Sequence, residues 1–191
     1  MKAAVKNAIS EGRRIIFTDE AMFTTSTITD RAYASKRDNV TLEEKLLSSP
    51  AIAVVAGVSA ERGLEAFFLQ PRSIDSDAFI QYLLTLLQHS PSSEFALFVD
   101  NCRVHHSIKV GEFMKDNKIL AIFNVPYGPE FNPIERVWSR IKTSFKKERL
   151  SEILEGNSPD YTKLVRRSML SCSNETICSI CRKTMRSKLD S

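Results

Sequence analysis

Three acidic residues stand at positions where carboxylates could work together. Asp19 and Asp100 each close a short apolar run, and Glu135 lies in the first turn of a predicted helix. Three oxygen ligands that converge at one sheet edge suit a hard cation, Mg²⁺ or Mn²⁺, and two such ions about 4 Å apart are typical of phosphodiester cleavage. Acids at strand ends and helix starts are also common as caps and turn residues, so the spacing alone leaves that interpretation open.

The elements that must position these acids begin with short strands. Apolar runs rich in Val, Ile and Phe predict five of them, which start near residue 15 and lie at 51–58, 64–69, 94–101 and 119–125. Turn residues at 61–63 join the second and third strands into a hairpin.

Two helices are expected between the later strands. Apolar residues at helical spacing predict a helix over 75–89, with Ser76 or Asp77 as its N-cap. A short helix follows at about 107–115.

A long helix then opens with strong signals. Asn132 is a preferred N-cap and Pro133 suits the first helical position, which places Glu135 in the first turn. Trp138 lies on the apolar stripe of this helix, so we expect it in the core.

The order of these elements predicts a mixed α/β sheet flanked by helices. The strands at 94–101 and 119–125 should be parallel neighbours with a right-handed crossover. In such sheets, ligand sites gather at the carboxyl ends of the strands.

Composition excludes several classes of protein. The chain has 191 residues, of which 42% are hydrophobic and 26% charged, so it can build a core and is neither disordered nor fibrous. No apolar stretch approaches the ~20 residues of a membrane-spanning helix, and the N-terminus does not read as a signal peptide. Four cysteines do not make a disulfide framework in a chain of this length, so we expect no membrane and a reducing, intracellular setting.

Charge is unevenly distributed along the chain. Residues 1–135 contain 14 Lys and Arg against 17 Asp and Glu, whereas residues 136–191 contain 13 against 6, which gives net charges of −3 and +7. The imbalance suggests a polyanionic partner, although a solvated lysine-rich face is a common alternative. The same two interpretations apply to the basic C-terminal tail.

Three sequence blocks resemble the catalytic blocks of the Tc/mariner group of cut-and-paste DNA transposases. They read IIFTDEAMF, FVDNCRVHHS and VPYGPEFNPIERVWSRIK, and 34 residues separate Asp100 from Glu135, which is one of that family's characteristic separations. The resemblance covers about residues 11–145, and its third block is the most specific.

This resemblance implies a ribonuclease H-like fold, shared with retroviral integrases, with a mixed five-stranded sheet. It makes Asp19, Asp100 and Glu135 the DDE triad that binds two Mg²⁺ or Mn²⁺ ions. Asn101 and His105 would support the metal ligands or contact DNA, and so would Asn132, whose cap aims Glu135. Glu20 also matches an acidic family position, but strand alternation should turn it away from the metal ions.

The implied reaction is DNA phosphodiester hydrolysis followed by strand transfer. The partners would be transposon ends and target DNA, bound by a homodimer or higher oligomer, in the nucleus if the source is eukaryotic. The polar faces of the long helix would track the DNA backbone through five cations, which are Arg136, Arg140, Lys142, Lys146 and Lys147.

The predicted organisation is a lead-in at 1–10, a catalytic domain at 11–150 and a basic helical extension at 151–191. Transposases of this group carry helix-turn-helix modules ahead of the catalytic domain. Because the first strand starts near residue 15, we expect these modules to be absent. The alternative function is an inactive or host-adopted DNA-binding or interaction module on the same fold. A ribonuclease H or a junction resolvase would share the fold but would not explain the Asn-Pro-Ile-Glu block.

Three cysteines of the tail leave a structural question. Cys178 and Cys181 have the spacing of half a zinc site, with Cys172 nearby, but no second pair follows. On a helix the first two lie one turn apart, so packing is the favoured interpretation.

Overall fold

The computed structural model describes residues 1–24, 51–157 and 160–189. Within them one five-stranded sheet has the order β3-β2-β1-β4-β5. Its strands are β1 (Arg14–Phe23), β2 (Ile52–Ser59), β3 (Gly63–Pro71), β4 (Phe95–Val99) and β5 (Leu120–Phe123). β1 pairs antiparallel with β2 and parallel with β4, and β4 pairs parallel with β5. The mixed sheet, its hairpin and its parallel pair confirm the predicted fold class.

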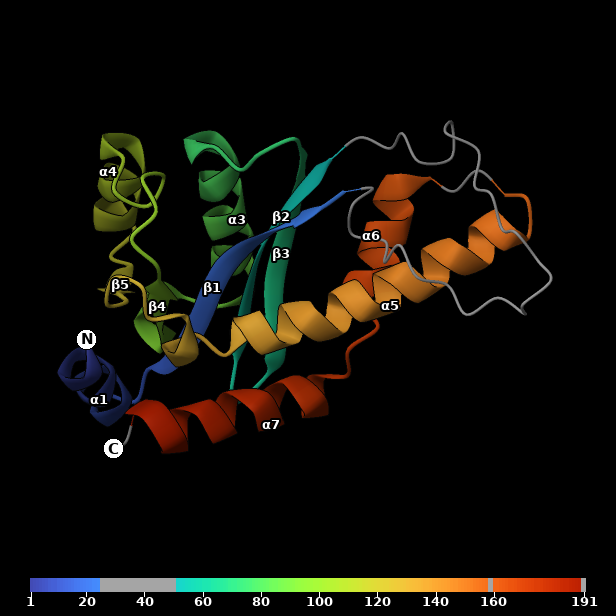
Figure 1. Cartoon of the computed structure of the whole chain (residues 1–191). Coiled ribbons are helices and arrows are strands. Elements are labelled where there is room, and N and C mark those ends of the chain that lie inside the picture. Colours follow the sequence, from blue (N-terminus) through green and yellow to red (C-terminus); the bar gives the residue numbers. More distant parts are fainter. Residues whose placement is uncertain (25–50, 158–159, 190–191) are drawn as a thin grey trace.

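Helices cover both faces of the sheet (Figure 1). They are α1 (Lys2–Ser10), α3 (Ser76–His89), α4 (Ile108–Asp116), α5 (Ile134–Leu154), α6 (Tyr161–Met169) and α7 (Asn174–Thr184), with short turns η2 (Ser92–Glu94), η3 (Pro129–Phe131) and η4 (Met185–Leu189). α3 and α4 build the core on one face, whereas α1, α5, α6 and α7 build the core on the other. None of the helices in the described ranges is long and apolar enough to cross a membrane.

Alternation along β1 decides which side chains meet which helices. Phe17 belongs to the core under α5, and Ile16 belongs to the core under α3. The hydroxyl of Thr18 lies 2.9 Å from that of Tyr82, on the α3 face. Asp19 and Glu20, next along the strand, therefore face opposite sides of the sheet.

The predicted N-cap of α3 is wrong. The cap of α3 is Asp75, whose carboxylate accepts a 2.8 Å hydrogen bond from the amide of Ala78, and not Ser76 or Asp77. The carboxylate bonds the amide three residues ahead, as N-caps do, and Ser76 is already the first residue of the helix. Ser107 caps α4 in the same way.

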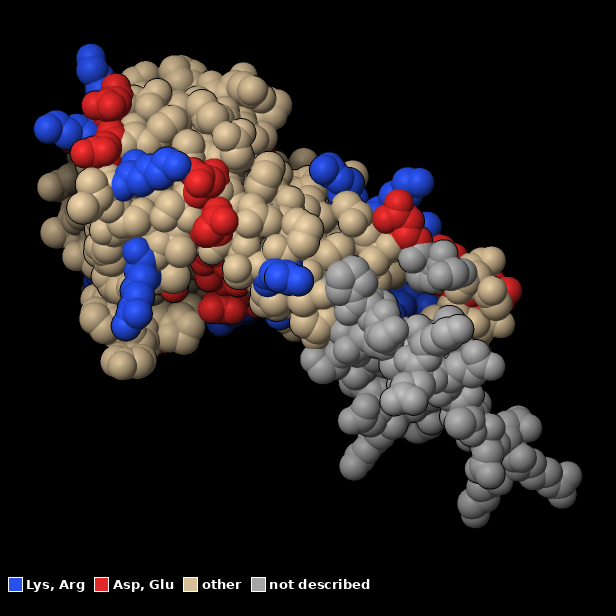
Figure 2. Space-filling model, turned by 90° about the horizontal axis from the view of Figure 1, so that it is seen from above, with Lys and Arg blue, Asp and Glu red and all other residues tan. Residues whose placement is uncertain are grey.

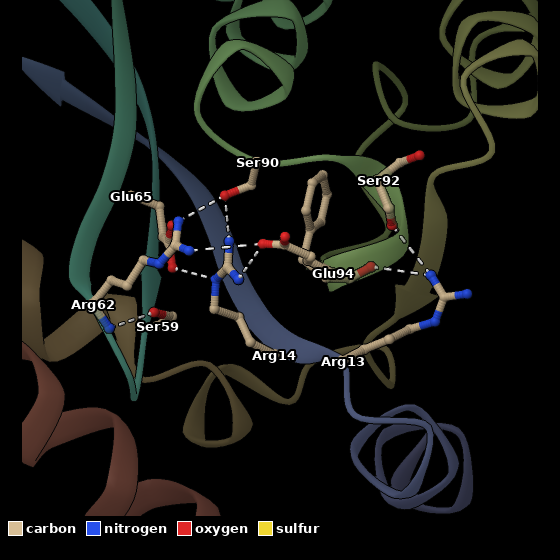
Figure 3. A network of polar contacts seen from close by, with 9 residues as sticks. Arg13, Arg14, Ser59, Arg62, Glu65, Ser90, Ser92 and Glu94 are labelled. Carbon is tan, nitrogen blue, oxygen red and sulfur yellow. Dashed lines mark hydrogen bonds and ion pairs between the residues drawn. The ribbon is translucent and has the colours of Figure 1, made fainter.

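A polar network ties the sheet together at the end where β1 and β4 begin (Figure 3). Arg14 donates to Glu65 at 2.8 Å, in an ion pair whose side chains are 10% and 3% exposed. The hydroxyl of Ser90 accepts from Arg14 and Arg62, and both guanidinium groups also approach Glu94. The two arginines and the two glutamates balance in charge, so we interpret the network as a structural one.

The C-terminal extension is helical in its described residues and packs into the main core. Residues of α6 and α7 share a core with α5, and the amide of Leu64 in the hairpin donates to Asn174 at 3.1 Å. The predicted domain boundary at residue 150 falls inside α5. Cys178 and Cys181 are buried in α7, and among the described residues no cysteine belongs to a cluster that could hold a metal ion.

Candidate active site

The three predicted acids line one pocket of about 550 Å³. Asp19 comes from β1, Asp100 follows β4 and Glu135 lies in the first turn of α5. The loop after β5 closes the pocket with residues 124–129. The fold thus brings together side chains that are up to 116 residues apart in the sequence.

Asp19 is held in an unfavourable electrostatic position. Burial, together with the negative charges of Glu135 and Glu20, raises the pKa of its carboxyl group to about 7. Trp138 opposes this effect, because its indole Nε1 donates to Asp19 Oδ2 at 3.0 Å. The sequence placed Trp138 in the core, where it is 3% exposed, but did not predict this hydrogen bond. The only available signal was its place one helical turn after Glu135.

Asp100 is anchored on one side by a histidine. Nδ1 of His105 lies 2.9 Å from Asp100 Oδ1, and the amide of Cys102 donates to the same oxygen. Hydrogen bonding from His105 is the main reason that the pKa of Asp100 lies below its usual range. The carboxylate is therefore ionised at neutral pH.

His105 also contacts Glu20, through Nε2 at 2.9 Å from Oε1. Burial lowers the pKa of the imidazole, but hydrogen bonds to Asp100 and Glu20 outweigh it and raise the pKa to about 10. Ligand atoms of Glu20, Asp100 and His105 lie within 4.8 Å of one another, as in a metal site. A doubly protonated imidazole has no lone pair for a metal ion, so we interpret this cluster as an ion-paired support for Asp100.

Asn132 connects the start of α5 to β1. Its Nδ2 donates to the carbonyl oxygen of Thr18 at 3.1 Å, and its Oδ1 accepts from the amide of Ile134 at 3.4 Å. The predicted cap is wrong, because α5 begins at Ile134 and its N-cap is Pro133, with no side-chain cap hydrogen bond. This bridge fixes Glu135 relative to the strand that carries Asp19.

Asn101 supports the loop that closes the pocket. Its Nδ2 donates to the carbonyl oxygen of Asn124 at 2.6 Å. Asn124 in turn donates to the carbonyl oxygen of Gly128 at 2.7 Å. A Cβ atom at Gly128 would lie 2.6 Å from a methyl group of Val125, so the glycine fits this compact turn. Sequence reasoning did not find Tyr127, which is fully exposed at the pocket rim with φ +58°.

The predicted DNA-binding cations divide into two groups. Arg140 and Lys147 line a second hollow between α5 and the turn before α7, whereas Arg136, Lys142 and Lys146 do not. On the face shown in Figure 2, acidic side chains form a band across the middle with basic side chains on either side.

A family model decides the relationship of this chain to known proteins. The model for DDE superfamily endonucleases matches residues 14–155, which include all three acids. The chain belongs to this family. No protein with a curated description matches this chain by sequence.

Solved structures of two kinds share the fold. The Mos1 transposase paired-end complex with left transposon end superposes with a TM-score of 0.65 at 12% identity, over 97% of this chain and 58% of that one. The Mos1 catalytic domain with Raltegravir and Mg gives 0.57 at 12% identity, over 97% and 88%. The HTLV-2 integrase catalytic core with magnesium gives 0.51 at 14% identity, over 83% and 82%. The chain therefore spans little more than half of the Mos1 chain in the first complex. The predicted membership of the DDE endonuclease superfamily and the predicted fold are confirmed.

Proposed function

We propose that this chain is a transposase catalytic domain that cuts DNA phosphodiester bonds and transfers the freed strand to a target. The observation that carries the proposal is the convergence of Asp19, Asp100 and Glu135 on one pocket. The names of the similar structures support it, because they describe Mos1 with a transposon end, Mos1 in a paired-end complex with Mn, and the Mos1 catalytic domain with Mg. A homodimer or higher oligomer on DNA stays a prediction.

The donor set suits divalent cations. The other polar side chains that line the pocket are three asparagines, one tyrosine and one cysteine, and no Lys, Arg or His of the described residues lines it. Burial and the negative charges of Glu135 and Glu20 raise the pKa of Asp19, and a bound cation would favour its ionised form. Asp19, Asp100 and Glu135 would hold two Mg²⁺ or Mn²⁺ ions. When bound, such ions activate water and stabilise the leaving oxygen.

The surrounding residues keep the ligand oxygens in place. Trp138 holds one oxygen of Asp19, and His105 holds one oxygen of Asp100. Asn132 fixes the start of α5 and with it Glu135. Positioning and charge neutralisation are the main contributions a protein makes to phosphoryl chemistry, so no covalent enzyme intermediate is needed. Exposed cations on α5 would orient the DNA backbone.

Substitution of one acid tests the proposal. We expect Asp100→Asn to abolish Mn²⁺-dependent nicking of supercoiled DNA while leaving DNA binding largely intact, because the fold and the cations remain. Asp116→Asn, at an exposed acid on α4, is the matched control and should nick as the parent does. Nicking by Asp100→Asn at the parent's rate would overturn the triad assignment. A parent that binds DNA but neither nicks it nor binds Mn²⁺ would favour the inactive binding module.

A further inference from the structure

The catalytic pocket leaves the basic charge of the C-terminal helices unexplained. α7 and η4 carry Arg182, Lys183 and Arg186, all exposed. None of these three forms an ion pair with a carboxylate in the ranges that the structure covers. On neighbouring α6, by contrast, Arg167 pairs with two glutamates of α5. The unpaired cations therefore remain available to a ligand.

These three cations line a hollow of about 540 Å³ on the molecular surface. Its other lining residues are Ser179 and Ser187, and no acidic side chain of the described residues contributes. Guanidinium, ammonium and hydroxyl groups together form the donor set that proteins use for phosphate oxygens.

A second hollow of about 450 Å³ lies at the other end of α7. Arg140 and Lys147 of α5 line one side, and Ser173 and Thr176 at the start of α7 line the other. No described acidic residue lines this hollow either. The N-terminus of an eleven-residue helix adds partial positive charge and favours anions.

One stripe of α7 and η4 joins the two hollows. Thr176, Ser179, Lys183 and Arg186 follow one another at steps of three or four residues, so they share one side of the helix. The buried residues of α7, such as Cys181, point away from that side. From Thr176 to Arg186 the stripe runs for about 15 Å along the helix axis. We call this stripe, with its two hollows, the α7 track.

Both ends of the α7 track lie close to the catalytic pocket. The second hollow, at the start of α7, is lined by Ser139 of α5, one turn beyond Glu135. At the other end, η4 contacts η3, whose Pro129 lines the pocket. α7 runs alongside α5 in Figure 1. Each end of the track therefore lies on or against an element that also contributes to the catalytic pocket.

We infer that the α7 track binds the sugar-phosphate backbone of duplex DNA, through contacts that do not read the base sequence. This inference rests on the proposed function and locates where that DNA lies. Each cation that neutralises a phosphate releases counterions, so it contributes about 0.9 to the slope of log K against log salt concentration.

Fluorescence anisotropy with a labelled 30-base-pair duplex, over a salt series, tests the inference. We expect the triple variant Arg182→Gln, Lys183→Gln and Arg186→Gln to make the negative slope of log K against log salt concentration shallower by about 2.7. The double variant Arg140→Gln and Lys147→Gln, at the other hollow, should make this slope shallower by about 1.8. The charge-matched control changes Lys109, Lys115 and Lys118 to Gln on and after α4, over the opposite face of the sheet, and should leave the slope unchanged.

The outcomes separate this inference from the proposed function. If the parent nicks DNA but the triple and double variants keep its slope, the α7 track is wrong and the catalytic proposal stands. An equal change of slope in the α4 control would also contradict the α7 track, because cations anywhere on the surface would then contribute equally to DNA binding. If the slopes of the triple and double variants become shallower as expected but the parent does not nick DNA, the α7 track is supported and the catalytic proposal fails. A parent without salt-dependent DNA binding contradicts both.

Discussion

At the scale of single residues, Asp19, one of the proposed metal ligands, depends on a neighbour that carries no charge. Trp138 is the only tryptophan of the chain, and its indole N–H holds Asp19 from the core side. The aromatic ring also packs edge-on against Phe23. The same residue therefore serves stability through its ring and the site through its nitrogen.

Trp138→Phe separates these two roles. The ring is kept and the donor is lost, so we expect the Mn²⁺ concentration for half-maximal nicking to rise about 10-fold, as when other groups that orient metal ligands are removed. Tyr82→Phe is the matched control, because it removes a buried hydrogen bond to Thr18 on the opposite face of β1. Equal Mn²⁺ dependence in both variants would show that the indole N–H does not position Asp19. In the parent, Trp138 fluorescence should change when Mg²⁺ is added.

At the scale of elements, close approach of backbone and side chain fixes how α3 lies on the sheet. A Cβ atom at Gly57 of β2 would lie 2.2 Å from Tyr82 Oη and 2.7 Å from a methyl carbon of Ile16. No larger residue fits at this point without displacing a side chain of the core. This contact accounts for the glycine in a strand that is otherwise rich in valine and alanine.

We therefore expect Gly57→Ala to lower the free energy of unfolding by about 1–3 kcal/mol, measured by urea denaturation. Tyr82→Phe should recover part of this loss in the double variant, because it removes the nearest clashing atom. Gly111→Ala is the control, since nothing lies within 4 Å of its Cβ position in α4. Because alanine is more stable than glycine inside a helix, Gly111→Ala should raise the free energy of unfolding by about 0.5–1 kcal/mol. Unchanged stability in Gly57→Ala would contradict the packing described here.

The elements also show what sequence could and could not predict. The strands and the hairpin were predictable because apolar runs and turn residues are local signals. α1 was missed and treated as a lead-in, because burial of Val5 and Ala8 against the main core, a tertiary contact, stabilises it. The hydrogen bonds from Trp138 and Asn132 join residues more than 110 positions apart, and no local pattern encodes them. The acids were predictable as a set only through the family resemblance.

At the scale of the whole molecule, the site sets the pH dependence of stability. The folded pKa of Asp19 is about 7 against 3.8 for the free residue, so its proton contributes stability that is complete below pH 4 and lost as pH rises through 7. His105 is likewise raised, from 6.5 to about 10, so its contribution is complete below pH 6.5 and lost as pH approaches 10. Both effects have the same sign, so the metal-free protein should be more stable at pH 5 than at pH 8.

Thermal unfolding at several pH values in EDTA measures this decline. We expect the stability of Asp19→Asn to depend less on pH between pH 4 and 7 than that of the parent. At pH 8 the variant should be about 2 kcal/mol more stable than the parent, because an uncharged amide replaces a buried carboxylate. Added Mg²⁺ should raise the Tm of the parent at pH 8 and have little effect on Asp19→Asn, since only the native parent binds it tightly. If the Tm of the parent is equal at pH 5 and pH 8 in EDTA, the pKa of Asp19 is not raised in the folded protein. In that case burial and the charges of Glu135 and Glu20 would not disfavour the ionised form of Asp19, and one electrostatic reason for placing a cation beside it would be lost.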